Sequence, residues 1–476
     1  MSFWRTITWP FRIIPWWGYL IGLAILAWFG RGVLLIGATI IAFHPIPVSP
    51  LFQGEPETVA QARLQDLEHF DHVRRNERSF DAESRQAFAD AIDALAARAA
   101  TLTDAEFQLE LARLQARIDN GHSNASATRM VQPFPRLPIR SAWFAGELRV
   151  LRALPGHQAM LGAQITAING ISADAAVWAF RDAFGGVDES YLTFAPLLLE
   201  SPDYLAAVGM AAEITTLEVI LTDGSTQIVT LEEVPPSADG ERVFSGDLLQ
   251  PWRREHDQWR VFEPAGDPLY LRHPDNAYWF EALPDGETVY VSLRANLDDD
   301  SGEPLSAWVA RAEAEIRALA PRTIIVDQRF NGGGDLTQTE PLMTALGDIV
   351  GEDGRVYLLA SGNTFSAGIV NLAMAKEAGP DRTYLVGEPI GDRLQFWAEG
   401  WWFSLPNSGF RARYSTGFYD LQNGCEGIFI CHWGSLHIFP VIVDDLDIDI
   451  SAPLTFEAYA AGRDPAMEAV WADLEG

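Results

Sequence analysis

Residues 286–388 constrain the fold most, because short apolar runs and amphipathic helical patterns alternate along them. The apolar runs are "TVYVSLRA", "RTIIVDQ", "RVYLLA" and "TYLVGE", and the helical patterns between them are "PLSAWVARAEAEIRALA", "LTQTEPLMTALGDIV" and "FSAGIVNLAMAKEAG". The run "RTIIVDQ" lacks polar–apolar alternation, as expected of a strand that is covered on both faces. The alternation of strand and helix predicts a layered α/β core.

Two different patterns precede this core. Residues 55–120 carry apolar side chains at three- and four-residue spacing, which predicts helices, and Thr103 with Glu106 forms a capping pattern. Residues 133–235 predict strands, including a hairpin at Asp223-Gly224. The resulting division is an N-terminal segment over 1–50, a helical domain over 51–130, a β module over 131–240 and the α/β core over 241–476.

The first 50 residues are far more apolar than the rest. The segment 16–43, "WWGYLIGLAILAWFGRGVLLIGATIIAF", is interrupted only by Arg31. A helix needs roughly 20 apolar residues to cross a bilayer core, so a single membrane anchor is predicted, with two short interfacial or re-entrant pieces as the alternative. Arg5 and Arg12 precede the segment, so the positive-inside rule places the rest of the chain in the periplasm or at the cell exterior.

Charge and rare residue types exclude several functions. The net charge of -31, from 65 acidic and 34 basic residues, argues against a nucleic-acid partner. No metal or cofactor is expected, because the chain lacks H-E-x-x-H and any Cys/His cluster with ligand spacing. His69 and His72 are interpreted as a surface pair. Cys425 and Cys431 either pair in an oxidising compartment or stay free thiols.

Ser366 lies where a strand pattern gives way to a helix pattern, in "YLLASGNTFSAGIVNLAMA" (357–375). Serine is a preferred N-cap residue, and this interpretation needs no function. The N-terminus of a helix also offers unpaired N–H groups and the positive end of a dipole, which would stabilise an oxyanion if the serine attacked a carbonyl. The local sequence favours the cap, because "GNTFSAG" is not the G-x-S-x-G elbow.

Two further loops carry residues that such chemistry needs. In "VDQRFNGGGD" (326–335), three glycines directly follow a buried strand, where backbone N–H groups can approach a ligand, although a tight turn would need no ligand. The loop is neither a phosphate loop nor a dinucleotide fingerprint. The loop "DNGHSNAS" (119–126) carries His122 at a predicted domain boundary, and histidine has the near-neutral pKa of a general base.

Together these segments resemble the tail-specific or C-terminal processing proteases, serine peptidases of the clan that includes the tricorn core protease. The matching stretches are "VDQRFNGGG" with D-[LV]-R-x-N-x-G-G, "NTFSAGIVNLA" with the serine-bearing loop, "LVGEPIGD" with G-E-x-T-G-G, "NGHSNA" with the D-G-H-[ST] loop of the tricorn-like branch, and "AYAAGRDPAMEAV" with the C-terminal helix. The resemblance covers much of 55–470. It implies a ClpP/crotonase-like layered core and a PDZ-like domain over 131–240.

The resemblance also implies roles for individual residues. Ser366 corresponds to the nucleophile and His122 to the base, and the backbone N–H groups of Gly333 and Ala367 correspond to the oxyanion hole. The tail-specific branch uses a lysine shortly after G-E-x-T. Arg393 occupies that place here, and an arginine cannot act as a general base, which leaves the Ser–His mechanism.

The acid that orients the histidine is less defined. Relatives of the triad type place a glutamate well after the serine, near the C-terminal β region, which makes Glu426 the first choice. Asp420, Asp445 and Glu399 stay open as alternatives. The glutamate that the family carries two or three residues after the serine is absent.

The sequence thus predicts a membrane-anchored, extracytoplasmic serine endopeptidase that hydrolyses polypeptides by Ser–His catalysis without a cofactor. The alternative is a non-catalytic peptide- or lipid-binding protein on the same scaffold, which would fit the loss of the lysine and of the usual acid. An α/β hydrolase acting on small esters is disfavoured, because G-x-S-x-G is absent. The oligomeric state stays open.

Overall fold

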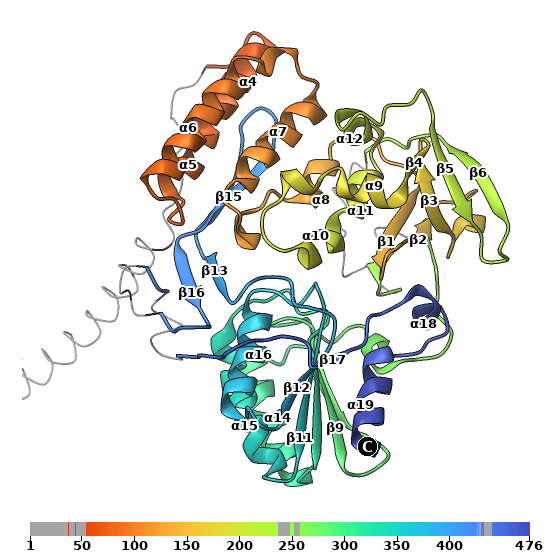
Figure 1. Ribbon diagram of the computed structural model, residues 1–476, viewed down its shortest axis with the longest axis vertical. Helices are drawn as coiled ribbons and strands as arrows, with labels where there is room; N and C mark the ends of the chain where they lie inside the picture. The colour runs from red at the N-terminus through yellow and green to blue at the C-terminus, as the bar shows by residue number, and fades with distance from the viewer. Residues whose placement is uncertain are drawn as a thin grey trace, which may run out of the picture.

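The computed structural model describes residues 37, 43, 54–236, 248–251, 258–425, 427, 430–432 and 440–476. Figure 1 shows a helical region and a β-rich region side by side above a layered α/β core. The predicted membrane segment, 16–43, lies outside the described residues except for Gly37 and Phe43. No helix in the described part of the chain is long and apolar enough to cross a bilayer.

The helical region contains the predicted helices. They are α4 (Val59–Phe70), α5 (His72–Asn76), α6 (Ala82–Ala96) and α7 (Asp104–Ala116), followed by the short α8 (Ala127–Val131). The capping box of α7 is confirmed: the Thr103 side chain accepts from the Glu106 N–H, and the Glu106 carboxylate accepts from the Thr103 N–H. The interpretation of a surface histidine pair is wrong for His69. That residue is only 4% exposed, because its ring packs edge-on against Phe403.

The β-rich region is an antiparallel sheet in the order β1-β2-β3-β5-β6. Its strands are β1 (Ile139–Phe144), β2 (Glu147–Ala153), β3 (Gln164–Ile168), β5 (Thr215–Ile220) and β6 (Thr226–Leu231), with β4 (Ile171–Ser172) beside β3 and β7 (Arg260–Val261) beside β2. Helices α9 (Ala173–Trp178), α10 (Asp188–Phe194), α11 (Pro196–Leu199) and α12 (Pro202–Ala207) lie between β4 and β5 along the chain. The β5–β6 hairpin confirms the turn that was predicted at Asp223-Gly224.

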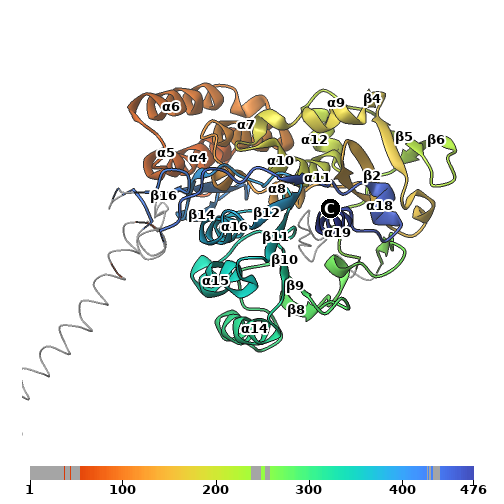
Figure 2. The same cartoon turned by 60° about the horizontal axis from the view of Figure 1, so that its bottom comes forward.

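The core contains a mixed sheet in the order β17-β12-β11-β10-β9-β8, in which only β8 is antiparallel to its neighbour. Its strands are β8 (Tyr278–Ala282), β9 (Thr288–Leu293), β10 (Thr323–Asp327), β11 (Arg355–Ala360), β12 (Thr383–Gly387) and β17 (Ile450–Ser451). Helices α14 (Leu305–Leu319), α15 (Glu340–Val350) and α16 (Ala367–Ala378) cover one face, and α19 (Pro465–Glu475) covers the other (Figures 1 and 2). Every residue of β10 is buried, which confirms the strand predicted to be covered on both sides.

Two small ladders connect the core to the helical region. They pair β13 (Gln395–Ala398) with β16 (Gly417–Asp420) and β14 (Trp401–Ser404) with β15 (Arg411–Tyr414). The apolar side chains of β14 and β15 join a single buried cluster that also runs through the helical and β-rich regions. The C-terminal α18 (Phe456–Ala460) packs instead beside Phe144 of β1. These contacts bring loops from all three regions to one place.

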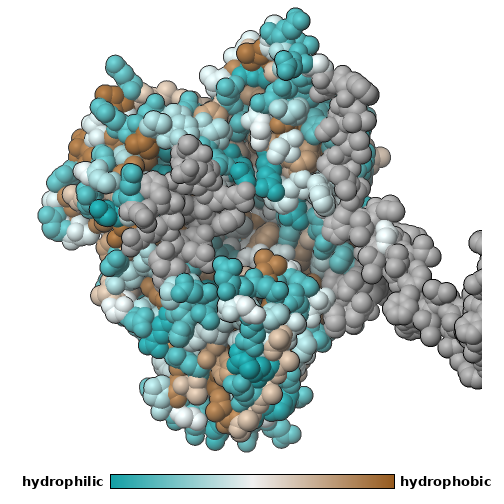
Figure 3. All heavy atoms as spheres, turned by 180° about the vertical axis from the view of Figure 1, so that it is seen from behind, coloured by the Kyte–Doolittle hydropathy of each residue, from teal (hydrophilic) through white to brown (hydrophobic). Residues whose placement is uncertain are grey.

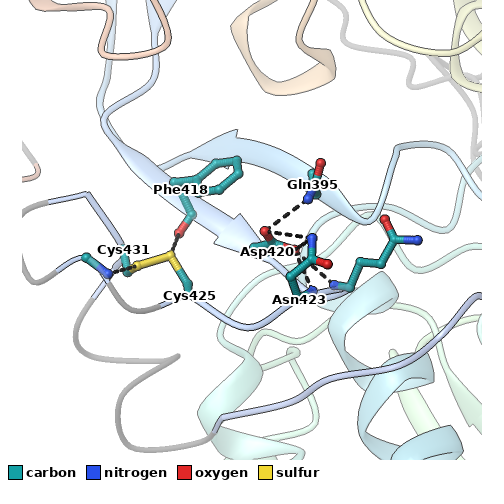
Figure 4. The surroundings of a disulfide bond; sticks show 8 residues. Gln395, Phe418, Asp420, Asn423, Cys425 and Cys431 are labelled. Atoms are coloured by element: carbon teal, nitrogen blue, oxygen red, sulfur yellow. Dashed lines mark hydrogen bonds between the residues drawn. A yellow bond between two sulfur atoms is a disulfide. The ribbon is translucent and has the colours of Figure 1, made fainter.

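The two cysteines form a disulfide, one of the two states left open by the sequence. Cys425 and Cys431 are bonded beside β16, where the Cys425 sulfur lies 3.7 Å from the Phe418 carbonyl oxygen (Figure 4). Next to it, the Asp420 carboxylate accepts hydrogen bonds from Gln395 and Asn423. The face seen in Figure 3 is mostly hydrophilic where residues are described, as expected of so acidic a chain.

Candidate active site

Ser366 ends the loop between β11 and α16 and occupies the N-cap position of the helix. Its side chain makes no capping hydrogen bond, and its backbone has φ 54° and ψ -124°. A residue with a side chain rarely adopts this region, at a cost of about 1–3 kcal/mol. The interpretation of Ser366 as an ordinary helix cap is therefore wrong, and its strained backbone needs another reason.

The loop that carries Ser366 rests on the glycine-containing loop that follows β10. Three hydrogen bonds join them: Ser361 Oγ to the Arg329 carbonyl at 2.7 Å, Thr364 Oγ1 to the Gln328 carbonyl at 2.8 Å, and the Phe365 N–H to the Asn331 carbonyl at 2.9 Å. Both loops thus behave as one rigid unit, as a positioned nucleophile requires.

Arg329 fixes this unit to the C-terminal helix. Its guanidinium donates to Asp327 at the end of β10 and to Asp464, the N-cap of α19, at 2.8 Å. All three side chains are buried, and the arginine holds the pKa of the Asp327 carboxyl below its usual range against the opposing effect of burial. The "DQR" and "RDP" stretches are therefore in direct contact in the structure.

Gly333 lies directly against Ser366. A Cβ on Gly333 would stand 2.5 Å from Ser366 Cβ and 3.0 Å from the Ala367 nitrogen, and its φ is 106°. In the part of the chain that the structure describes, nothing accepts a hydrogen bond from the Ala367 N–H. The Gly333 N–H instead donates to Asn331 Oδ1 at 2.9 Å. The two residues predicted for an oxyanion hole are thus adjacent. Among the described residues, the Ala367 N–H has no acceptor, whereas the Gly333 N–H is hydrogen-bonded to Asn331.

We predict that Gly333→Ala lowers kcat about 100-fold, because the new methyl group displaces Ser366 and strains the loop. The measurement is steady-state cleavage of an unstructured polypeptide. Gly332→Ala is the matched control, since a Cβ on Gly332 meets nothing within 4 Å. Equal loss of activity in the two variants would show that the contact with Ser366 is unimportant.

His122 lies in a short 3₁₀ turn (Gly121–Ser123) and faces the same unit. Its Nδ1 is 3.2 Å from Asp392 Oδ2, and the two side chains are 3% and 2% exposed. The imidazole is stacked between Phe365, at 4.3 Å between ring centroids, and Phe396, at 5.0 Å. Because Phe365 directly precedes Ser366, the predicted nucleophile and base come from neighbouring parts of one site.

The environment of His122 favours a neutral imidazole. Burial lowers the pKa of His122, and the Asp392 carboxylate opposes this only in part. If Nδ1 donates its proton to Asp392, Nε2 carries a lone pair. Nε2 is buried and has no hydrogen-bond partner among the described residues, so it is not bonded to Ser366 in this conformation. The geometry provides a base that is ready to accept a proton.

The lowered pKa gives an expected pH profile. The active form has neutral His122, and burial makes protonation harder, so kcat/KM should persist at pH 6.5 and fall only at lower pH, along a limb with a midpoint below the ordinary value of 6.5. Initial rates between pH 4 and pH 9, on the order of ten points, measure this limb. A midpoint at or above 6.5 would contradict the inferred environment of the base.

Asp392 is the carboxylate that the sequence argument missed. Glu426, the first choice, lies outside the described residues, while Glu399 accepts from the Tyr419 hydroxyl at 2.6 Å and Asp420 from Gln395 at 2.9 Å. Asp445 accepts from the Asp447 N–H. Among the described residues, none of these three carboxylates hydrogen-bonds to His122, whereas Asp392 does.

Two contacts in the structure hold Asp392 beside His122. Asp392 directly precedes Arg393, whose guanidinium binds the Asp119 carboxylate at 3.0 Å and its carbonyl at 2.8 Å, so the Asp392 loop is tied to the His122 loop. A Cβ on Gly121 would also stand 2.8 Å from Asp392 Oδ2, which explains a glycine before the histidine. The arginine in the place of the family's lysine therefore connects two loops.

A cavity of about 220 Å³ adjoins the unit formed by the two loops. The loops contribute Arg329, Phe330 and the segment 361–363, and β1 contributes Trp143 and Phe144. The walls are mainly apolar, with the carboxylates of Glu189 and Glu388 among them. Such a cavity has the character of a binding site for part of a substrate.

The fold is similar to that of known peptidase structures. Mature CPAF complexed with lactacystin matches with a TM-score of 0.56 at 14% identity, over 87% of this chain and 98% of that one. A serine-to-alanine variant of CPAF matches with a TM-score of 0.56 at 13% identity, over 85% and 95%. The tricorn protease matches with a TM-score of 0.35 at 12% identity, over 88% and 36%. No protein-family model and no curated protein sequence matches the chain.

At these identities, the similarity to CPAF concerns the fold. It confirms, at the level of the fold, the resemblance that the motifs predicted. Because 87% of this chain is matched, the helical region, the β-rich region and the α/β core are each matched at least in part.

Proposed function

We propose that this chain is a serine endopeptidase in which Ser366 attacks the scissile carbonyl of a polypeptide, His122 acts as the base and Asp392 orients His122. One observation carries the proposal. Ser366 has a strained backbone at a helix N-terminus without capping it. The residue before it, Phe365, stacks on the imidazole of a buried His–Asp pair, and Gly333 beside it leaves no room for a side chain.

The proposed reaction begins when substrate binding brings Ser366 Oγ to the unpartnered Nε2 of His122. Hydrogen bonds of this kind are often long or absent before substrate is bound. His122 takes the hydroxyl proton as Oγ attacks the carbonyl carbon, and it later gives that proton to the leaving amine. Water then hydrolyses the acyl-enzyme, with His122 again as the base.

The tetrahedral oxyanion would accept a hydrogen bond from the free Ala367 N–H. Gly333 would supply the second donor by exchanging its bond to Asn331 Oδ1 for the oxyanion. Both donors lie beside the N-terminus of α16, whose dipole favours negative charge. The adjoining cavity is where we place a substrate side chain, because it is bounded by the same two loops.

A fluorophosphonate probe tests the chemistry directly. We expect the full chain to be labelled at Ser366, as located by mass spectrometry of the digested product, and to cleave an unstructured polypeptide. Labelling that is absent, or that falls on another serine, would overturn the proposal. It would then favour the non-catalytic peptide- or lipid-binding protein.

We further propose that residues from about 50 onward lie outside the cytoplasm, behind an anchor at 16–43. The disulfide between Cys425 and Cys431 supports an oxidising compartment. We also propose that the β-rich region is a PDZ-like module that binds a peptide by strand addition. The exposed edge strand β6, with Ile228 72% exposed, supports that role.

A further inference from the structure

Glu77 is a buried carboxyl group for which the proposed mechanism has no use. It follows α5, it is 0% exposed, and it belongs to the helical region, far from His122 in the sequence. Four donors converge on it: the Ser79 N–H at 3.1 Å and hydroxyl at 2.8 Å on Oε1, and the Ser415 N–H at 2.9 Å and the Ser123 hydroxyl at 3.0 Å on Oε2.

The cluster around Glu77 reaches the residue next to His122. Ser123 directly follows His122, and its Oγ also lies 2.8 Å from Ser415 Oγ and accepts from Asn120 Nδ2 at 3.0 Å. Asn120, two residues before His122, exchanges hydrogen bonds with the backbone of Trp397 at 2.8 Å and 3.1 Å. The turn that carries His122 is therefore held on both sides by buried polar groups.

The restraint matters because a single hydrogen bond fixes the imidazole within its own plane. Phe365 and Phe396 cover its two faces and prevent tilting, but flat stacking contacts oppose rotation within the ring plane only weakly. Its one hydrogen bond, to Asp392, is at 3.2 Å, the upper end of the ordinary range. The orientation of Nε2 then depends on the backbone turn, which Ser123 anchors, as well as on Asp392.

We infer that Glu77 is a positioning residue for His122, acting through the hydroxyl of Ser123. The inference rests on the proposed function, in which His122 is the base. A carboxylate suits this place because it accepts from all four donors at once, which offsets the cost of removing it from water. Burial raises the pKa of Glu77 and the four hydrogen bonds oppose that change, while the partly buried Arg413 guanidinium is a nearby positive charge.

The test compares Glu77→Gln with a matched control, Asp66→Asn, in the full chain. Asp66 is also 0% exposed, lies in the same region on α4, and accepts from the backbone N–H groups of Asn407 and Ser408 at 2.8 Å, with no hydrogen bond to the His122 turn. Both variants should unfold at lower temperature. Only Glu77→Gln should lower kcat about tenfold or more, with KM changed less than about twofold. Equal effects on kcat would overturn the inference.

Ser123→Ala, alone and combined with Glu77→Gln, tests whether Glu77 acts on His122 through the Ser123 hydroxyl. If Glu77 acts through Ser123, the double variant should be no slower than the slower single variant. Effects that multiply would show that Glu77 acts in another way.

The NMR spectrum of the His122 ring tests whether Glu77 positions His122, and it does so without a measurement of catalytic activity. The protein is labelled with nitrogen-15 in its histidine rings, and the signals of His122 are identified by their loss in His122→Ala. These signals should shift or broaden in Glu77→Gln and stay unchanged in Asp66→Asn. An unchanged His122 signal in Glu77→Gln would overturn the inference. If the parent chain neither cleaves nor is labelled, the proposed function fails, and this spectrum still tests the role of Glu77.

Discussion

His122→Ala should lower kcat for polypeptide cleavage by about 10⁴- to 10⁶-fold, and Ser366→Ala should do the same. Each variant removes one end of a single proton transfer, so the remaining partner has nothing to act on. The double variant should therefore be no slower than either single variant. KM should change little, because neither side chain contributes much to holding the rest of a polypeptide. Steady-state and single-turnover cleavage of one unstructured substrate measures all three.

The matched control is His69→Ala, which also removes a buried imidazole from an aromatic contact, since His69 packs against Phe403 in the helical region. It should lower thermal stability and leave kcat within about threefold of the parent. Fluorophosphonate labelling should disappear in Ser366→Ala and become much slower in His122→Ala. If His122→Ala retained more than about a tenth of the activity, another group would have to be the base.

The elements were predictable because their signals are local. The capping box of Thr103 and Glu106, the glycine turn of β5–β6 and the unbroken apolar run of β10 each need only a few neighbouring residues. The contact between His122 and Asp392 spans 270 positions and depends on how two loops meet. The resemblance directed attention to the C-terminal β region, whereas the carboxylate lies in the loop between β12 and β13.

The ambiguity of Ser366 has a similar origin. A cap and a nucleophile both occupy the first position of a helix, so the residue type alone cannot separate them. The backbone separates them: the capping residue Thr103 has φ -71° and ψ 172°, the extended conformation from which a side chain reaches back to the helix, whereas Ser366 has φ 54°. That difference in backbone conformation cannot be read from the local sequence, because it depends on the packing of Gly333 and Asn331 around the loop.

Asp392→Asn should lower kcat about 10⁴-fold while leaving the fold intact. The amide has nearly the same shape, and its oxygen can still accept from the Arg393 N–H, now at 2.9 Å from Asp392 Oδ1. The amide nitrogen would then face His122 and donate to Nδ1, which forces the proton onto Nε2. A histidine in that tautomer cannot take the proton of Ser366. Cleavage rates, with the His122 ring signals as a report on the tautomer, measure the effect.

Glu399→Gln and Glu426→Gln are the comparison variants, because both residues were candidates for the same role. Asp392 raises the pKa of His122 through a hydrogen bond and through its charge, whereas Glu399 does so through its charge alone and accepts a hydrogen bond from the Tyr419 hydroxyl. Glu399→Gln should lower kcat less than about tenfold, because a carboxylate that contributes only electrostatically does not determine the tautomer of His122. If Asp392→Asn kept the parent's rate, Asp392 would not be the orienting acid. If in addition one glutamine variant were about 10⁴-fold slower than the parent, that glutamate would be the orienting acid, and the contact between His122 and Asp392 would belong to a resting conformation.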